Sequence, residues 1–387
     1  MTSTLITPAP DSLSALETPC AVLDLDRMER NIGRLREHLD GLGVSLRPHL
    51  KTAKSVEIAQ RVMTAPAGPA TVSTLKEAEQ FAQAGVTDLT YAVGIEPTKL
   101  QRVIALRAAG ADIAVLLDSV EQAHIVVAAS RDSGEPIPAL IEIDCDGHRS
   151  GIDPADAERI TAIGRLLAEG ASLRGVLAHA GASYGARSET ELRACADNER
   201  DAVVRAANTL REAGLPCPVV SAGSTPTAHF ADDLTGVTEI RAGVFVFFDL
   251  VMAGLGVCQI DDIALSVMAT VIGHQVDKGW IIVDAGWMAM SRDRGTAKQS
   301  VDQGYGVVCD QNGKPYPGLI MADANQEHGV LAIRNDSTAA LPDLQIGDRV
   351  RILPNHACAT GAQHDRYHVI RGSSGHIEAE WPRFGGW

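Results

Sequence analysis

The chain of 387 residues is long enough for two domains, and its hydrophobic content of 45% with a mean hydropathy of +0.02 is ordinary for a globular enzyme. Its formal net charge of −15, with no Lys/Arg cluster, argues against nucleic acid and anionic membranes as partners and favours small-molecule chemistry. No stretch resembles a membrane span or a secretory signal, and the seven scattered cysteines fit a reducing compartment, so we expect a cytoplasmic protein.

The first part of the chain, residues 1–42, is predicted to contain a strand followed by a helix over 20–41, and we expect this helix to cap the next domain. In residues 43–250, short β-branched runs then alternate with longer amphipathic patterns that mostly end in Gly. The predicted strands are 44–47, 70–73, 88–91, 112–117, 138–144, 172–178, 218–222 and 238–241. Eight such units predict a (β/α)₈ barrel of the α/β class, whose active site lies at the C-terminal ends of its strands.

The pattern changes in residues 251–387. There the helical period almost disappears, and β-rich runs are separated by Gly, Asn, Asp and Pro. These runs predict a second, all-β domain at the C-terminus.

Lys51 lies where the first barrel strand ends and where a helix over 52–61 is predicted to begin. An isolated lysine is usually a solvated surface charge. At the mouth of a barrel, however, an amine is the group that forms a Schiff base with a carbonyl, including that of pyridoxal phosphate. Lys51 is therefore the leading candidate for a catalytic residue.

Arg149 and His179 follow the fifth and sixth predicted strands, at the same end of the barrel as Lys51. Arg149 is suited to donate hydrogen bonds to an oxyanion, but a structural ion pair with a neighbouring Asp explains it equally well. His179 is distinguished only by its position, because a lone histidine is more often a satisfied core or surface residue.

The seventh predicted strand runs into Gly223, Ser224 and Thr225, and the eighth runs into Gly243 and Val244. Barrels commonly build a phosphate site from the loops after these two strands, using backbone N–H groups and hydroxyls. A Gly-Ser-Thr turn is common loop chemistry by itself. Its placement after the seventh strand is what predicts a phosphate site.

The all-β region contains a pair of side chains suited to a metal, His356 and Cys358. Residues two apart on an extended chain face the same way, and imidazole with thiolate suits Zn²⁺ or a similar transition metal. A buried cysteine beside a capping histidine is the competing interpretation. Two protein ligands would leave coordination positions open for water or substrate.

Several long stretches carry a resemblance to a known family; they are RPHLKTAKS, VSTLKEAEQF, EIDCDGHRSG, VVSAGSTPT, TEIRAGVFVFFDLV, VDAGWMAMSRDRGTA, NQEHG and LPNHACATGAQ. Together they resemble the fold-type III pyridoxal-phosphate enzymes, which have an alanine-racemase-like TIM barrel and a C-terminal β domain. Within that class the chain is similar to the D-serine dehydratase and D-threonine aldolase family. The resemblance covers nearly the whole chain, and the stretches occur in the order of that family.

The resemblance implies that pyridoxal 5′-phosphate is held by Lys51 as a Schiff base. It implies that Arg149 lies near the phenolic oxygen of the cofactor, that His179 packs on its pyridine ring and that Tyr184 lies nearby. Arg241 matches a position that faces the pyridine nitrogen in the racemases. The residues implied to bind the phosphate are Gly223, Ser224, Thr225, Gly243 and Val244.

By the same resemblance, His356 and Cys358 match the metal ligands of the dehydratases, with Zn, Mn, Co or Mg as the divalent ion. In the aldolases the second ligand is typically Asp, so Cys358 favours dehydration. The tyrosine-bearing motif of the racemases is not evident. The implied enzyme is a lyase that dehydrates D-3-hydroxyamino acids, most of all D-threo-3-hydroxyaspartate to oxaloacetate and ammonia, and also D-serine to pyruvate.

Two alternatives remain open from the sequence. The first is an aldolase that acts on D-threonine or D-phenylserine and releases glycine and an aldehyde. The second is a non-catalytic cofactor-binding protein of the barrel-only type, against which the β domain and the His-x-Cys pair argue. The resemblance also implies a homodimer. Arg292 and Arg294 are candidates for holding a second substrate carboxylate, with two surface arginines as the competing interpretation.

Overall fold

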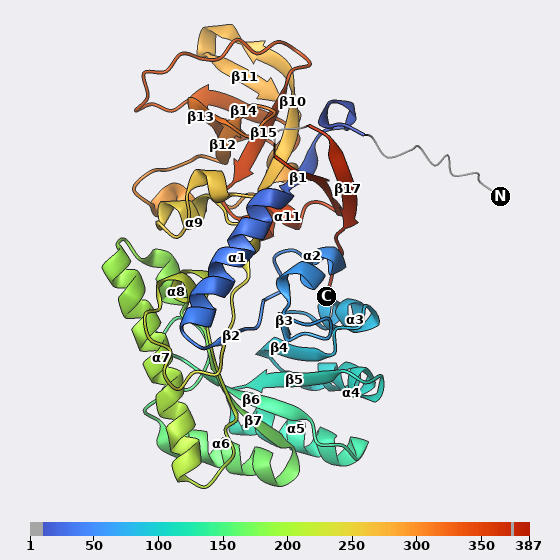
Figure 1. Ribbon diagram of the computed structural model, residues 1–387, viewed down its shortest axis with the longest axis vertical. Coiled ribbons are helices and arrows are strands. Elements are labelled where there is room, and N and C mark those ends of the chain that lie inside the picture. The colour runs from blue at the N-terminus through green and yellow to red at the C-terminus, as the bar shows by residue number, and fades with distance from the viewer. Residues whose placement is uncertain (1–10, 373–374) are drawn as a thin grey trace, which may run out of the picture. The chain divides into compact units, whose positions relative to one another are not determined.

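A computed structural model describes residues 11–372 and 375–387 (Figure 1). The chain forms two compact units. One, which we call the β unit, consists of Met1–Asn31 and Val246–Gly385; the other, the barrel unit, consists of Ile32–Phe245 with Gly386–Trp387. No helix among the described residues is long and apolar enough to cross a membrane.

The barrel unit is built on eight parallel strands: β2 (Ser45–Leu46), β3 (Ala70–Val72), β4 (Asp88–Gly94), β5 (Asp112–Leu117), β6 (Pro138–Ile143), β7 (Ser172–Ala178), β8 (Val219–Ala222) and β9 (Glu239–Ile240). They are ordered β2-β9-β8-β7-β6-β5-β4-β3. The N–H of Leu50 donates to the Thr71 carbonyl, and the N–H of Thr71 donates to that of Pro48, both at 2.9 Å, which closes the sheet between β2 and β3. The predicted barrel of eight strands is therefore confirmed.

Helices alternate with these strands (Figure 1). They are α1 (Leu25–Gly41), α2 (Val56–Val62), α3 (Leu75–Gln83), α4 (Leu100–Ala108), α5 (Val120–Ser133), α6 (Ala157–Gly170), α7 (Glu189–Glu212) and α8 (Thr225–Phe230). Several begin at a side-chain cap, as where Thr74 accepts a hydrogen bond from the Glu77 N–H. The helix predicted over 52–61 begins only at Val56, because residues 51–53 form a turn and Lys54 adopts a positive φ of 45°.

The β unit contains a nine-stranded sheet. Its strands are β1 (Cys20–Asp24), β10 (Leu265–Gln275), β11 (Trp280–Val283), β12 (Gly306–Cys309), β13 (Pro315–Ala324), β14 (Gly329–Ile333), β15 (Arg349–Pro354), β16 (Arg366–Ile370) and β17 (Ile377–Pro382). The order is β11-β14-β13-β12-β15-β10-β1-β16-β17, and β10 also pairs with β11. Short helices α9 (Leu250–Gly254), α10 (Trp287–Met290) and α11 (Ala357–Gly361) lie between strands.

The N-terminal strand belongs to this sheet. Every residue of β1 is buried, and the strand pairs antiparallel with β10 and parallel with β16. A strand buried along its whole length needs hydrogen-bonding partners on both edges. For this reason the segment up to Asn31 lies in the β unit, whereas the sequence suggested a separate N-terminal segment over 1–42.

The β unit has an apolar core on one face of its sheet. Val267 on β10 lies opposite Ile352 on β15, and both are fully buried. Val283, Leu331 and Val350 are buried with them. Complete burial of a side chain of this kind contributes roughly 1.5–3 kcal/mol, so this core anchors the strand ends from which the loops of the β unit leave.

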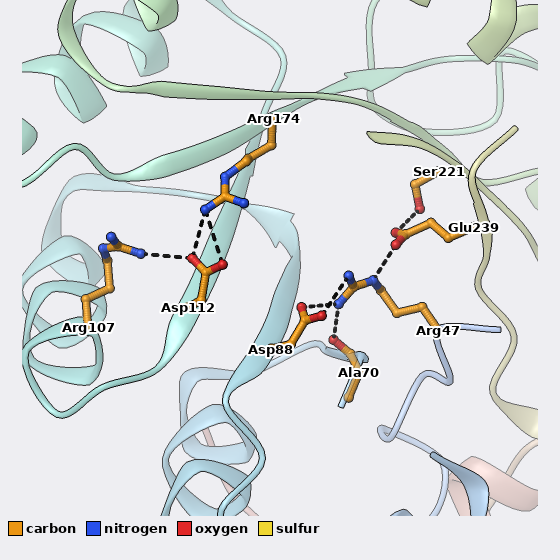
Figure 2. A network of polar contacts seen from close by, with 8 residues as sticks. All are labelled: Arg47, Ala70, Asp88, Arg107, Asp112, Arg174, Ser221 and Glu239. Carbon is orange, nitrogen blue, oxygen red and sulfur yellow. Dashed lines mark hydrogen bonds and ion pairs between the residues drawn. The ribbon is translucent and has the colours of Figure 1, made fainter. Parts of the chain in front are cut away.

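The barrel unit also contains a partly buried polar network (Figure 2). Arg47 Nε donates to Glu239 Oε2 at 2.7 Å, and its Nη1 donates to Asp88 Oδ1 at 2.8 Å. Ser221 Oγ donates to the other oxygen of Glu239 at 2.7 Å and accepts from Arg241 Nη1 at 2.6 Å. Burial alone lowers the pKa of Arg47, but Glu239 and Asp88 outweigh it and raise that pKa. The network therefore links charged groups on β-strand ends to Arg241, a predicted site residue.

Candidate functional site

Lys51 is exposed in the turn that follows β2. Its backbone N–H lies 3.5 Å from Nδ1 of His49. Burial lowers the pKa of His49 well below its ordinary value, and the charges of Lys51, Arg241 and His179 lower it further. His49 was not singled out from the sequence, yet it shares one electrostatic environment with three residues that were.

His179 follows β7, and its Nδ1 lies 3.0 Å from the carbonyl oxygen of Gly223. Burial lowers the pKa of His179 to about 3; the hydrogen bond to Gly223 opposes this shift, and the charge of Lys51 adds to it. The ring is therefore uncharged at neutral pH. Tyr184 lies in the short helix Gly181–Gly185, and its ring centroid is 6.3 Å from that of His179. The structure thus brings together the two predicted aromatic contacts of the cofactor.

The first residue of α8, directly after the loop that follows β8, carries a buried hydroxyl without a hydrogen-bond partner among the described residues. Thr225 is 1% exposed, and no described residue forms a hydrogen bond with its Oγ1. An unpaired buried hydroxyl is costly unless a ligand or water completes it. Next to it, Ser224 accepts a hydrogen bond from the Thr227 N–H at 3.2 Å and so caps α8. The start of α8 therefore has a buried donor that could meet an anion such as the predicted phosphate.

Two glycines of the predicted phosphate site lie against other backbone segments. Gly223 has a φ of +134°, and a Cβ there would lie 2.2 Å from the carbonyl oxygen of Arg241. At Gly243 a Cβ would lie 3.1 Å from the His49 carbonyl oxygen and from Thr52 Oγ1. Glycine is required at the first position and gives close packing at the second. Val244 follows and is buried.

Glu199 on α7 supports this loop and was missed by sequence reasoning. Its Oε1 accepts from the N–H groups of Ala180 at 2.8 Å and Gly223 at 2.9 Å, and its Oε2 accepts from Thr227 Oγ1 at 2.7 Å. Burial raises the pKa of Glu199, while these three hydrogen bonds lower it. The carboxylate ties the loop after β7 to the loop after β8. In the sequence it is one of several acidic residues on a polar helix, so no local signal marks it.

The two predicted arginines of the barrel unit differ in their surroundings. Arg241 is buried, and its Nη2 donates to the Ala178 carbonyl at 2.6 Å while Nη1 binds Ser221. Burial lowers its pKa. Arg149 is exposed, and its Nη2 lies 3.7 Å from Glu142 Oε1. Its ion pair is therefore long and is formed with a Glu, not with the neighbouring Asp that the sequence suggested.

In the β unit, His356 and Cys358 lie at the start of α11. The prediction of an extended chain is wrong here, because His356 caps a helix that begins at Ala357 and contains Cys358. The two side chains still meet. Burial alone lowers the pKa of His356, but hydrogen bonds to Asp293 and Cys358 outweigh it and raise that pKa to about 11.

Asp293 was also missed by sequence reasoning. Its Oδ2 lies 2.7 Å from His356 Nδ1, and its carbonyl accepts from Asn355 Nδ2 at 3.3 Å. A metal-binding histidine typically holds a carboxylate on its other ring nitrogen. This leaves His356 Nε2 for a metal, beside the Cys358 sulfur. The described part of the chain contains no group of three or more His, Cys, Asp or Glu side chains arranged for a metal.

Comparisons with known proteins agree with this architecture. The family model of the alanine racemase N-terminal domain matches residues 23–251, and that of the serine dehydratase domain matches residues 264–370. The chain is 54% identical to the D-threo-3-hydroxyaspartate dehydratase of Delftia sp. (strain HT23), over 97% of this chain and 100% of that protein. It is 30% identical to the D-serine dehydratase of Dictyostelium discoideum, over 93% of this chain and 95% of that protein.

Among solved structures, the chain is similar to a cysteine-to-alanine mutant of a D-threo-3-hydroxyaspartate dehydratase in the metal-free form. The two are 54% identical, with a TM-score of 0.94 over 98% of this chain and 100% of that one. Both family models, in this order along the chain, and the shared fold lead to one assignment. This chain belongs to the fold-type III pyridoxal-phosphate enzymes of the D-serine dehydratase and D-threonine aldolase family.

Proposed function

We propose that this chain is a lyase that uses pyridoxal 5′-phosphate and a divalent metal to dehydrate D-3-hydroxyamino acids, with D-threo-3-hydroxyaspartate as its main substrate and D-serine as a second one. The observation that carries the proposal is the contact of Asp293 with His356 beside Cys358, which is suited to hold a metal with open coordination positions. The 54% identity to a dehydratase of this substrate supports it.

In the barrel unit, we assign Lys51 to hold the cofactor and then to take the α-proton of the substrate on its Nζ. When bound, pyridoxal phosphate supplies a ring that delocalises the electron pair left by that proton. His179 and Tyr184 would flank the ring, and the neutral state of His179 is supported by its lowered pKa. Arg149 would meet the phenolic oxygen and Arg241 the side of the pyridine nitrogen.

The phosphate would be held by the loops after β8 and β9. The unpaired hydroxyl of Thr225 supports this assignment, since a phosphate oxygen would complete it. The other proposed contacts come from Gly223, Ser224, Gly243 and Val244. Glu199 would act from behind the loop, without touching the cofactor.

In the β unit, we assign His356 Nε2 and the Cys358 thiolate as metal ligands. When bound, the divalent ion supplies Lewis acidity at the β-hydroxyl of the substrate. Imidazole with thiolate favours Zn²⁺ among the candidates, ahead of Mn²⁺, Co²⁺ and Mg²⁺. Loss of water and hydrolysis of the resulting imine give oxaloacetate and ammonia from hydroxyaspartate, and pyruvate and ammonia from serine.

The test is a product assay. Enzyme supplied with pyridoxal phosphate and metal is incubated with D- and L-3-hydroxyamino acids, and ammonia, keto acid, glycine and aldehyde are measured together. We expect equal amounts of ammonia and keto acid from the D-substrates. Glycine with an aldehyde would instead identify the aldolase reaction. A protein that binds the cofactor but does not exchange the α-proton of any D-amino acid would be the non-catalytic alternative.

We further propose that the chain functions as a homodimer in the cytoplasm. The dimer follows from the family resemblance and is tested by light scattering of the purified protein. The seven cysteines are scattered along the sequence without the spacing of a disulfide framework, which supports a reducing compartment.

A further inference from the structure

The segment Ser291–Thr296 is fixed beside the proposed metal ligands, and we call it the arginine loop because it carries Arg292 and Arg294. Asp293 in this loop contacts His356, and Thr296 Oγ1 donates to Asn355 Oδ1 at 2.7 Å. Just before the loop, the carbonyl of Met290 accepts from Thr360 Oγ1 at 2.6 Å. The loop is therefore held against both sides of the segment that contains His356.

The backbone of this loop is also unusual. Ser291 is 8% exposed and has a φ of 74°, in the region that non-glycine residues rarely adopt. Its hydroxyl accepts a hydrogen bond from the Asp293 N–H at 3.2 Å. Strain of this kind persists where surrounding contacts over-determine it, and it is common at ligand-binding sites. It fixes the direction in which the next residue, Arg292, leaves the loop.

The two arginines of the loop are not equivalent. Arg294 Nη2 forms an ion pair with Asp302 Oδ2 at 2.8 Å, and its guanidinium carbon lies 4.9 Å from the centroid of the Tyr305 ring. Arg292 is exposed and forms no ion pair with any residue in the described part of the chain. Its guanidinium carbon lies 5.1 Å from the centroid of the Trp287 ring. The ring orders the guanidinium and leaves its N–H edge for a ligand.

In hydroxyaspartate the second carboxylate lies next to the hydroxyl that the proposed metal would bind. The β-carbon carries both the hydroxyl and that carboxylate. A group that binds the carboxylate must therefore lie close to the ion that binds the hydroxyl. Arg292 is the neighbour in sequence of Asp293, the residue that contacts His356. A guanidinium without an ion-pair partner is opposite in charge to a carboxylate and can donate two parallel hydrogen bonds to it.

Resting on the function proposed above, we propose that Arg292 binds the second carboxylate of D-3-hydroxydicarboxylic amino acids and so selects hydroxyaspartate over D-serine. Arg294 is committed to Asp302 and does not contact this carboxylate. D-Serine has hydrogen in place of the carboxylate, so it gains nothing from Arg292.

The test compares Arg292→Met with Arg294→Met as the matched control. For Arg292→Met we expect kcat/KM for D-threo-3-hydroxyaspartate to fall by about 10- to 100-fold, mainly through KM, because a charge-assisted hydrogen bond is lost. D-Serine turnover should change by less than about threefold, since that substrate makes no such bond. Arg294→Met should show no selective loss. Arg292→Lys keeps the positive charge but loses the pair of parallel N–H donors. Its kcat/KM for D-threo-3-hydroxyaspartate should therefore lie between the values of wild type and Arg292→Met.

Metal content is measured in every variant, because Arg292 adjoins a residue that supports a metal ligand. Unchanged metal content with a selective loss on hydroxyaspartate supports the proposal. An equal loss on both substrates, or a selective loss in Arg294→Met alone, overturns it. Failure of the proposed function is a separate result, namely wild-type enzyme that releases no ammonia and keto acid from either substrate.

Discussion

At the scale of single residues, Asp293 orients the ring of His356, a proposed metal ligand. Its carboxylate oxygen lies 2.7 Å from Nδ1, which leaves Nε2 as the nitrogen available for coordination. The carboxylate also makes the imidazole a more basic ligand. Sequence reasoning named the arginines on either side of Asp293 but not Asp293 itself.

We predict that Asp293→Asn weakens metal binding by about 10- to 100-fold, as expected for loss of the carboxylate behind a ligating histidine. Competition of the purified protein against a chromophoric chelator measures the affinity. Asp302→Asn is the control, because Asp302 is an exposed acidic residue of the same unit and pairs with Arg294. Equal metal affinity in Asp293→Asn and wild type would contradict the prediction.

His179 gives a prediction for pH. Its pKa is lowered from 6.5 to about 3 in the folded chain, mainly by burial. Below pH 6.5 the unfolded chain therefore binds a proton that the folded chain does not, and stability is lost as the pH falls from 6.5 toward 3. His179→Gln removes this loss and keeps a donor for the Gly223 carbonyl.

Urea unfolding at about pH 7 and about pH 5 tests this sign. Between those two values the wild type should lose about 2 kcal/mol more unfolding free energy than His179→Gln. A pH dependence that is the same in both proteins, or steeper in the variant, would show that the ring is not held neutral by the fold.

At the scale of elements, the loops after β7 and β8 are held by a helix that carries none of the proposed cofactor contacts. Glu199 projects from α7 and accepts hydrogen bonds from both loops, at Ala180 and Gly223. A helix next to the barrel thus sets the spacing between the proposed ring-packing residue His179 and the proposed phosphate loop. Loops that contact a ligand are usually held in this way by the elements behind them.

We predict that Glu199→Gln weakens pyridoxal phosphate binding by about tenfold. The amide nitrogen that takes the place of Oε2 cannot accept the hydrogen bond that Thr227 Oγ1 donates. Fluorescence titration of the cofactor-free protein gives the affinity. Pyridoxal, which lacks the phosphate, should lose less affinity than pyridoxal phosphate.

Glu77→Gln is the matched control. Glu77 is a fully buried carboxylate of the same unit that accepts from Ser73 and Thr74 and pairs with Lys54. Its variant should lose stability without a change in the preference for pyridoxal phosphate over pyridoxal. A similar loss of preference in both variants would mean that Glu199 has only a general structural role.

The elements also show where sequence patterns are informative. All eight barrel strands were predictable, because most are short runs that contain β-branched residues and are bounded by turn residues. The start of α2 was not, since the left-handed conformation of Lys54 depends on its surroundings and not on its residue type. Glu199 and Asp293 act on partners that are distant along the chain, and no local pattern encodes such a partner. The family resemblance, not periodicity, predicted roles for Arg149, Tyr184 and Arg241.

At the scale of the whole molecule, the proposed cofactor residues lie in the barrel unit and the proposed metal ligands lie in the β unit. We therefore predict that removing the metal leaves the cofactor in place. After treatment with a chelator, the absorbance of bound pyridoxal phosphate should persist while ammonia release falls by at least about 100-fold. Activity should return on addition of Zn²⁺. Release of the cofactor by the chelator, or an unchanged rate, would contradict this.

The pairing of β1 with β10 and β16 has a consequence for how the protein is made. β1 ends at Asp24, whereas its partners begin at Leu265 and Arg366. During synthesis this apolar strand leaves the ribosome before β10 and β16, so both of its edges stay without these partners until β16 has emerged. The barrel strands between β2 and β9 are complete long before then, and domains generally fold as they emerge. β1 can therefore complete its pairing only after β16 has emerged, and until then its unpaired edges are open to aggregation.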